Sequence, residues 1–406
     1  MNIPKLRFKD NNGNDYPQWN HSSFYNTFNF LSTNNYSRND MNSINGNIRN
    51  IHYGDILTKF NYIINTEKDI LPYLNDNIII KNLPNYIIQS GDIVIADTAE
   101  DYTTGKTCEI INSNNQLVVA GLHTMLCRPK QNIFALGFLG YFMNSNIYHN
   151  QLLPLITGIK VYSILKKEII KTKISIPFIE EQKKIAKFLT TVDKKIENIE
   201  NTITSLENQK KGLLQQIFSQ KLRFKDKNGN NYPNWEKKKL EDIAIFLDNK
   251  RKPLEQSERI HGKYPYYGAS GIIDYINDYI FDEELVLLSE DGANIIDRNY
   301  PICYIATGKY WVNNHAHVLK VKSQYVNKFI CESLEQLNYT KYNTGTAQPK
   351  LNQDVCRKII LSIPCLEEQT KIANFLSTFD RKLENQKAQL EHWKQIKKGL
   401  LQQMFV

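Results

Sequence analysis

The chain has no long hydrophobic run, and this absence argues against a membrane-spanning protein. Its longest apolar stretch, residues 133–143, is too short to cross a bilayer and is interrupted by Gly137 and Gly140. The opening MNIPKLRFKD also lacks the apolar segment of a secretory signal. We therefore expect a cytoplasmic protein.

Cysteines are few and carry no paired spacing. The six Cys residues include no CxxC motif, so we expect reduced, mostly buried thiols and neither a disulfide framework nor a zinc site. His315 and His317 fall on one side of a predicted strand, as two metal ligands would. No Cys or third His stands at ligand spacing, so we interpret both as ordinary solvent or core histidines and predict no metal site.

Nucleotide and methyl-donor motifs are incomplete. Residues 104–107 (TGKT) resemble the end of a phosphate-binding P-loop, but that loop needs a glycine where the chain has Glu100. No glycine-rich loop after a strand marks a cofactor site. The sequence therefore favours recognition without catalysis, and we predict neither catalytic nor cofactor-binding residues.

What the chain does contain is typical of a basic globular protein. Hydrophobic residues make up 41% and charged residues 23%, and 406 residues allow two or three domains. The formal net charge of +9 suits a polyanionic partner, although many proteins that bind none are as basic.

One long helix is predicted twice. Residues 175–218 and 362–405 match throughout at a constant offset of 187, without gaps, and both start with an IPxxEEQ motif. Glu180, Glu181, Glu367 and Glu368 fit the first helical turn, where acidic residues are favoured. Apolar residues recur at alternating steps of four and three, which predicts a stripe that another helix must cover. The first stripe is Ile185, Leu189, Val192, Ile196, Ile199, Ile203, Leu206, Leu213 and Ile217, with Lys210 at a seam position. The second is Ile372, Leu376, Phe379, Leu383, Gln386, Leu390, Trp393, Lys397, Leu400 and Met404.

A second duplicated segment precedes each variable region. Residues 5–19 (KLRFKDNNGNDYPQW) return as 221–235 (KLRFKDKNGNNYPNW), with twelve of the fifteen positions identical. The chain is therefore two tandem units, each made of a turn segment, a variable region and a long helix.

The variable regions read as mixed α/β globules. We predict strands at residues 91–96, 116–120, 285–288 and 300–307, and helices at 132–145 and 327–338. The predicted boundaries are 1–175 for the first domain with its turn segment, 176–220 for the central helix, 221–362 for the second domain and 363–406 for the last helix.

The duplicated motifs resemble those of specificity subunits of bacterial type I restriction-modification enzymes. The resemblance covers essentially the whole chain. It rests on the IPxxEEQxKIAxFL helix starts, the KKGLLQQ helix ends, the KLRFKD segments, and YPYYGASGIIDYI, EDGAN, GKYWVNNHAHVL and TGTAQPKL in the second variable region. The first variable region departs from TGTAQP, with TGIKVY at residues 157–162.

The resemblance implies an α+β fold with two target-recognition domains separated by two antiparallel coiled-coil helices, in a pseudo-two-fold tandem repeat. Each domain would read one half of a split DNA target. The implied partners are double-stranded DNA, two methylation subunits and restriction subunits. The chain itself would bind no cofactor, since S-adenosylmethionine, ATP and Mg belong to the partners.

The residues support this function independently. Two similar units suit two half-sites about one helical turn apart, and a rigid strut would fix their separation. Polar seam residues such as Lys210, Lys397 and Gln386 would penalise wrong registers of an antiparallel pair. We predict DNA contacts in the second domain by Lys263, Tyr267, Ser270, Arg298, Lys309, Asn313, Asn314, His315, Gln348 and Lys350. The contacts predicted in the first domain are Tyr102, Thr103, Lys106, His123, Lys160 and Tyr162.

Two other functions stay open at this point. A coiled-coil scaffold could bind only proteins, and salt-sensitive DNA binding would distinguish it from a DNA reader. An enzyme could rest on residues 104–107, and ATP hydrolysis or methyl transfer by the isolated chain would support it.

Overall fold

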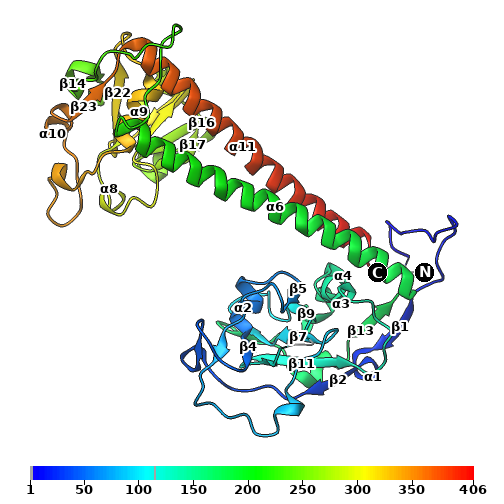
Figure 1. Cartoon of the computed structure of the whole chain (residues 1–406). Helices are drawn as coiled ribbons and strands as arrows, with labels where there is room; N and C mark the ends of the chain where they lie inside the picture. The colour runs from blue at the N-terminus through cyan, green and yellow to red at the C-terminus, as the bar shows by residue number, and fades with distance from the viewer. Residues whose placement is uncertain (1–2, 114–115) are drawn as a thin grey trace. The chain divides into compact units, whose positions relative to one another are not determined.

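The computed structural model of the chain describes residues 3–113 and 116–406 and divides into two compact units. The first unit holds Met1–Glu200 and Ala388–Val406, and the second holds Asn201–Lys387. Two long helices, α6 (Ile179–Phe218) and α11 (Leu366–Gln403), each contribute a part to either unit (Figure 1). None of the described helices is long and apolar enough to cross a bilayer.

The first unit is built on a five-stranded sheet. Its strands lie in the order β2 (Phe28–Leu31), β11 (Thr124–Pro129), β7 (Ile93–Ala96), β9 (Thr107–Ile111) and β5 (Ile63–Asn65). Only the β5–β9 pair is parallel; the others are antiparallel. β7 is buried at every position, which explains why it reads as a continuous apolar run and not as an alternation.

Shorter elements complete the first unit. A four-stranded sheet has the order β10 (Val118–Ala120), β4 (Arg49–Ile51), β6 (Tyr73–Leu74) and β3 (Met41–Asn42). Two further pairs are β1 (Asn20–Ser23) with β13 (Lys173–Ile176) and β8 (Thr98–Ala99) with β12 (Tyr162–Ser163). The short helices are α1 (Phe24–Thr27), α2 (Tyr53–Thr58), α3 (Phe138–Met143), α4 (Asn146–Leu152) and α5 (Lys166–Ile169).

The second unit has two four-stranded sheets. One has the order β15 (Ala244–Phe246), β22 (Ala316–Val321), β19 (Leu285–Ser289) and β20 (Cys303–Ala306). The other has the order β17 (Gly271–Ile276), β16 (His261–Gly268), β21 (Lys309–Val312) and β18 (Phe281–Asp282), and β14 (Glu236–Lys239) pairs with β23 (Ile360–Ile363). The short helices are α7 (Leu240–Ile243), α8 (Asn294–Asp297), α9 (Asn327–Glu335) and α10 (Gln353–Arg357).

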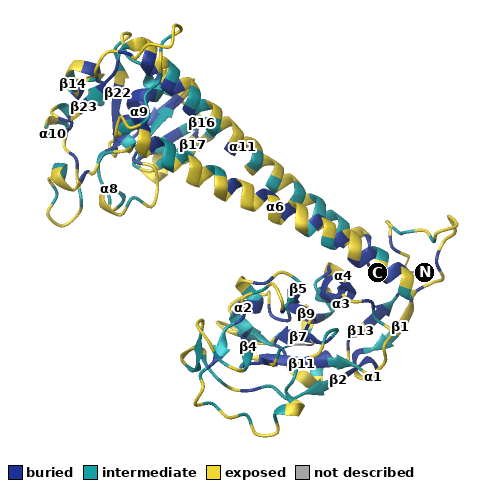
Figure 2. Cartoon of the chain, in the orientation of Figure 1, coloured by how far each residue is buried: buried dark blue, intermediate teal, exposed yellow. Residues whose placement is uncertain are grey.

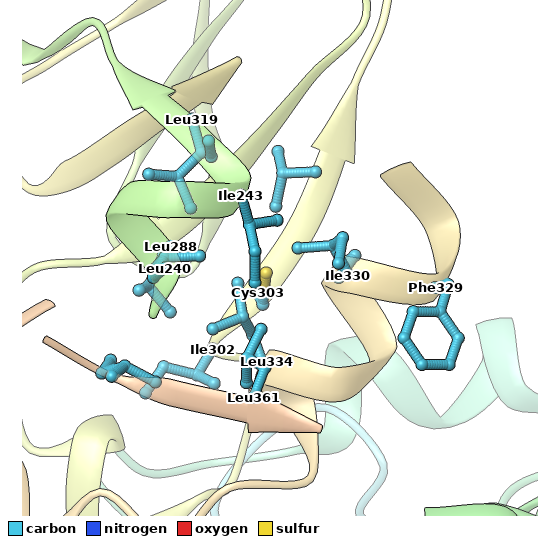
Figure 3. Close-up of a cluster of buried hydrophobic side chains, with 14 of the residues drawn as sticks. Leu240, Ile243, Leu288, Ile302, Cys303, Leu319, Phe329, Ile330, Leu334 and Leu361 are labelled. Atoms are coloured by element: carbon cyan, nitrogen blue, oxygen red, sulfur yellow. The ribbon is translucent and has the colours of Figure 1, made fainter. Parts of the chain in front are cut away.

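The two units share one framework. The order β2-β11-β7-β9 in the first unit repeats as β15-β22-β19-β20 in the second, and the β1–β13 ladder repeats as β14–β23. Figure 3 shows the core of the second unit, where Leu288, Cys303 and Leu319 of the sheet pack with Ile330 and Leu334 of α9. The predicted strands and helices are confirmed in these positions, with shorter bounds except for β19, which extends one residue beyond the predicted 285–288.

In each unit a stretch of α6 packs against a stretch of α11 that runs the opposite way. In the first unit Asp193 pairs with Lys397 (2.7 Å) and Glu200 with Lys394 (2.8 Å), so numbering rises along one helix as it falls along the other. The second unit repeats this direction with Lys210–Asp380 (2.6 Å) and Glu207–Lys387 (2.8 Å). The predicted α+β fold with antiparallel long helices and a tandem repeat is confirmed.

The predicted stripe of α6 is buried over most of its length, whereas that of α11 is buried at Ile372, Leu376, Leu383 and Met404 and half-buried at its other positions. Figure 2 shows buried positions recurring along one side of the long helices. Near the end of α6 the burial shifts by one residue, since Leu214 is buried and Leu213 only half-buried. Two of the three polar seam residues, Lys210 and Lys397, ion-pair across the seam, as a register-setting role requires. The third, Gln386, is half-buried.

The duplicated turn segments close over the starts of the long helices. Arg7 donates hydrogen bonds of 2.8 and 2.9 Å to Glu181, and the Trp19 indole donates another of 3.2 Å. Glu368 accepts the equivalent bonds from Arg223 and Trp235. Both glutamates are fully buried, so they anchor these segments as well as occupying the first helical turn. Their neighbours Glu180 and Glu367 are exposed in the first helical turn, and Glu180 also pairs with Lys183 (2.8 Å).

The end of each long helix enters the core of the unit that it reaches. Phe405, just beyond α11, is buried against Trp19, Phe138 and Phe142 of the first unit. Its repeat equivalent, Phe218, packs against Trp235 and Phe329 of the second unit. The two units are therefore closed by equivalent aromatic contacts.

We predict that Phe405→Ala lowers the free energy of unfolding of the first unit by about 3–5 kcal/mol, because it leaves a cavity among aromatic rings. Hydrogen exchange read separately in the two units measures this loss. Phe218→Ala serves as the matched control, with a smaller loss confined to the second unit because Phe218 is only half-buried. Unchanged exchange in the first unit of the Phe405 variant would contradict the packing role.

Candidate nucleic-acid interface

In the second unit three loops gather where β19 ends. The Ser289 hydroxyl donates to the carbonyl of Ala269, at the tip of the β16–β17 hairpin. The Glu290 N–H donates to the carbonyl of His315 in the β21–β22 turn (2.9 Å). The Leu351 N–H, from the loop between α9 and α10, donates to the Glu290 carbonyl (2.7 Å). These hydrogen bonds, one from the Ser289 side chain and two between backbone groups, bring the hairpin tip, the turn and the loop to one place.

Five of the predicted DNA contacts are exposed on these three loops. They are Ser270, Asn314, His315, Gln348 and Lys350. His315 lies 2.8 Å from Asp291, and the Lys350 ammonium lies 3.3 Å from Glu290. Hydroxyl, amide, imidazole and ammonium groups together offer the donors and acceptors that base edges and phosphates require.

Three other predicted contacts are engaged within the unit. Asn313 is 4% exposed, and its side-chain oxygen accepts from the His315 N–H (2.8 Å). Tyr267 packs on the rings of Tyr304 and Tyr310. Arg298 pairs with Glu335 (2.7 Å) and lies over the Tyr339 ring. Their contacts with DNA stay predictions, while the geometry shows each of them packed or paired within the unit.

Lys263 and Lys309 lie at the opposite end of β16. The parallel pairing of Tyr266 with Trp311 places both lysines near the starts of β16 and β21, away from the gathered loops. Lys263 lies over the Tyr264 ring and Lys309 over the Tyr279 ring, and both side chains are exposed. The predicted residues of the second unit therefore form two exposed groups and one internal group.

A buried ionic cluster holds the gathered loops. The Arg251 guanidinium lies 2.6 Å from Glu290 and 3.5 Å from Asp248, and His317 Nδ1 lies 2.6 Å from Asp248. His317 Nε2 faces the Leu351 carbonyl at 2.7 Å. Both ring nitrogens thus face acceptors, so both carry protons. This cluster was missed in the sequence, where His317 reads as an ordinary histidine.

Charge pairing fixes the protonation state of this cluster. Burial disfavours a charged imidazole at His317, yet its hydrogen bond with Asp248 raises the pKa to about 10. Burial likewise disfavours the Asp248 carboxylate, but hydrogen bonds from His317 and the Val318 N–H lower the pKa of Asp248. Oxygen and nitrogen atoms of Asp248, Glu290 and His317 lie within 4.8 Å of one another. The imidazolium and Arg251 already supply the positive charge that a metal ion would bring, so the cluster is an ionic lock for the loops.

The first unit gathers its predicted residues in an equivalent way. β8 and β12 pair so that Tyr162 opposes Ala99, and the Tyr102 ring lies 4.8 Å from the Tyr162 ring. His123 lies 3.6 Å from Asp97, just before β8. Tyr102, Thr103, His123 and Lys160 are exposed, and Tyr162 is half-buried. These five residues converge on one set of loops.

His123 and His315 occupy the same place in the shared framework. The Asp97 N–H donates to the His123 carbonyl (3.1 Å), as the Glu290 N–H does to that of His315. The Ile164 N–H donates to the Asp97 carbonyl (2.9 Å), as the Leu351 N–H does to that of Glu290. Two residues chosen independently from the sequence are therefore structural counterparts.

The duplicated Thr-Gly loops close identically. The Thr157 N–H donates to the Ser163 carbonyl (2.9 Å), and the Thr344 N–H donates to that of Lys350 (2.8 Å). A glycine follows each threonine. A Cβ added to Gly158 would lie 1.9 Å from the Val161 carbonyl oxygen, and a Cβ added to Gly345 would lie 1.8 Å from that of Gln348. Only glycine fits these turns. The residues at their tips can vary while the loop keeps its shape.

Lys106 lies apart from the other predicted residues of the first unit. Its ammonium donates to the carbonyls of Leu57 (3.1 Å) and Phe60 (2.8 Å). The N–H groups of Gly105, Lys106 and Thr107 all donate within the unit, so this segment forms no phosphate-binding loop. The P-loop likeness of residues 104–107 is a coincidence of sequence.

Replacing the charged histidine tests the ionic lock. The folded-state pKa of His317 lies above its unfolded value of 6.5, so its stabilisation is fully present below about pH 6.5 and is lost as the pH rises toward 10. We predict that His317→Gln costs about 1–3 kcal/mol of unfolding free energy at pH 6 and progressively less at higher pH. Thermal unfolding of the full chain from pH 6 to 10 measures the difference. His261→Gln, an exposed histidine of the same unit, is the control and should follow wild type. A constant cost across the pH range would contradict a charged His317.

Comparison with known proteins agrees with this geometry. The family model for the type I restriction modification DNA specificity domain matches residues 2–208 and 232–392. A putative type I restriction enzyme specificity subunit of Haemophilus influenzae is 38% identical over 139 residues, covering 34% of this chain and 36% of that protein. The putative MjaX specificity subunit of Methanocaldococcus jannaschii is 24% identical over 367 residues, 85% of either chain. The matched segments span 36%, 42% and 46% of the length of three curated relatives, the Haemophilus influenzae protein being the first of them.

Solved structures share the fold. The S subunit of a type I restriction-modification system from M. genitalium superposes with a TM-score of 0.61 at 15% identity, covering 99% of both chains. A chain from a structure of complex assembly in a type I R-M system gives a TM-score of 0.57 at 14% identity, covering 96% and 98%. With both family-matched regions lying over the two repeated units, the chain belongs to the type I restriction modification DNA specificity family.

Proposed function

We propose that this chain is the DNA-reading subunit of a type I restriction-modification complex, with each unit reading one half of a bipartite target. The repeated loop arrangement supports this proposal more than any other observation. Each unit brings a Thr-Gly loop and a histidine-bearing turn together at the same edge of the same framework, and presents polar side chains there. A protein with two such faces suits a target with two halves.

Direct base reading is assigned to the gathered loops. Ser270, Asn314, His315, Gln348 and Lys350 would meet bases and nearby phosphates of one half-site. The loops around His123, Lys160 and the paired rings of Tyr102 and Tyr162 would meet the other. Lys263 and Lys309, which stand apart over tyrosine rings, suit the phosphate backbone.

The long helices would set the spacing of the half-sites. A heptad stripe covered by an antiparallel partner makes a stiff rod, because each helix prevents the other from bending toward solvent. The seam pairs Asp193–Lys397 and Lys210–Asp380 favour one register over its neighbours, since a slip would leave a lysine among apolar side chains. A fixed register gives the paired helices a fixed length. That length would in turn fix the number of base pairs between the half-sites.

The chemistry would belong to the partners. Two methylation subunits would transfer methyl groups from S-adenosylmethionine to adenine, and restriction subunits would move and cut DNA with ATP and Mg. The exposed side chains near the ends of the long helices are the proposed docking surface for the methylation subunits. We place the complex in the cytoplasm, and the chain itself in a non-catalytic role.

Mapping modified adenines tests the whole proposal. We expect cells that carry this chain and its methylation partner to modify adenines within one split motif, with two defined half-sites and an invariant gap. Sequencing that reads modified bases directly measures this. A protein-only scaffold predicts no motif linked to this chain, and the purified complex would then bind duplexes without a counterion slope.

A pair of variants separates base reading from phosphate binding in the second unit. Asn314→Ala should relax one base position, with discrimination there reduced by about 1–3 kcal/mol. Lys309→Ala should weaken binding to all sequences and reduce the slope of log affinity against log salt by about 0.9. Each variant is the control for the other in the same binding titrations. An unchanged motif and an unchanged slope would remove both assignments.

A further inference from the structure

A basic cavity lies in the first unit between the region after α2 and the long helices. Its volume is about 570 Å³, within the usual size range of small-ligand sites. Five lysines line it: Lys59, Lys106, Lys394, Lys397 and Lys398. All of them belong to the first unit, and the cavity is distinct from the loops proposed to read bases.

Only two of these lysines have carboxylate partners within ion-pair distance in the described chain. Lys394 lies 2.8 Å from Glu200 and Lys397 lies 2.7 Å from Asp193. Lys106 donates to the backbone carbonyls of Leu57 and Phe60, and Lys59 donates to that of Ile70. Lys398 forms no ion pair with any described residue. The carboxylate of Asp69, which acts on Lys59 from a distance, accepts from the Asn65 N–H (2.7 Å). The cavity therefore carries a surplus of positive charge.

The second unit shows that the repeated framework does not require this surplus. The equivalents of Lys397 and Asp193 there are Lys210 and Asp380, which also pair. Two further charges occupy the positions of Tyr141 and Ser145, namely Lys328 and Glu332, and they pair with Asp380 and with each other. Two lysines thus face two carboxylates, so these four side chains carry no net charge together. In the first unit the equivalent positions hold one lysine and one carboxylate, Lys397 and Asp193. The positive surplus there comes from the other cavity lysines that have no carboxylate partner among the described residues, namely Lys59, Lys106 and Lys398.

The surplus has a cost within the first unit. Burial lowers the pKa of Lys106, and the nearby ammonium of Lys397 lowers it further. An anion in the cavity would relieve this repulsion by facing several ammonium groups at once. The backbone N–H groups near Lys106 are already used, so the ammonium groups would supply the attraction.

We infer that this cavity binds phosphate groups, either of the DNA backbone or of a free oligophosphate such as a nucleotide. Ammonium groups hold phosphate as point charges and do not need one fixed orientation. The cavity could therefore accept a phosphate from either source.

Inorganic triphosphate is the first probe. We expect the full chain to bind it saturably in calorimetric titration, and Lys59→Gln with Lys398→Gln to weaken that binding about tenfold, which is about 1.4 kcal/mol. Both lysines are exposed, so the double variant should fold normally. The matched control is Lys195→Gln with Lys211→Gln, which removes two exposed charges elsewhere, Lys211 being the repeat equivalent of Lys398. The control should bind triphosphate as wild type does.

A second measurement identifies the source of the phosphate. In the complex with methylation subunits, we expect the cavity variant to lower the slope of log DNA affinity against log salt by up to about 2 if the cavity holds backbone phosphates. An unchanged slope with weakened triphosphate binding assigns the cavity to a free oligophosphate. If the cavity and control variants match in both measurements, the inference is wrong. If the wild-type complex binds DNA without any sequence preference, the proposed function is wrong. The triphosphate titration would still show whether the cavity binds phosphate.

Discussion

The apolar seam between the two long helices is the constraint on which the rest of the structure depends. A helix with a continuous heptad stripe cannot leave that stripe in water, and here the only helix of matching length and pattern among the described residues is its duplicate. Covering one stripe with the other in antiparallel fashion brings the start of each helix beside the end of the other. Each unit must then be built around one helix start and one helix end. This is why Phe405 lies in the core of the first unit and Phe218 in that of the second.

The duplicated segments follow from the same constraint. A helix start that is packed into a core leaves a carboxylate, Glu181 or Glu368, with no access to water. Such a group is tolerated only when paired, and the arginine and tryptophan of the KLRFKD segment provide the partners. The identity of the two segments is therefore explained by a buried electrostatic requirement that occurs twice. Their exposed turns contribute nothing to it, and the three sequence differences lie in or after those turns.

The sequence predicts the framework well and the recognition surface less well, for physical reasons. Periodicity and duplication report burial along regular elements, so the long helices, the strands and the tandem order could be predicted. Side-chain direction in loops depends on contacts made by residues far apart in the chain. Asn313 and Asn314 are adjacent and identical, yet one is buried as a turn cap and the other is exposed. Lys106 and Arg298 are predicted DNA contacts because of their charge, and in the structure each has tertiary partners within its unit that no local sequence pattern encodes.

The ionic lock around His317 shows how a recognition loop can vary without losing its shape. The loops of the second unit are fixed by backbone hydrogen bonds and by buried charges, neither of which involves the exposed side chains of Asn314 or Gln348. In the first unit the same backbone bonds recur around Asp97, while the residues at the loop tip are entirely different. Because the backbone bonds and the contacts among Arg251, Asp248 and His317 do not use the side chains of Asn314 or Gln348, substitutions at these two positions alter what is contacted and leave the framework intact. One duplicated fold can in this way present two unlike surfaces, which is what two unlike half-sites would require.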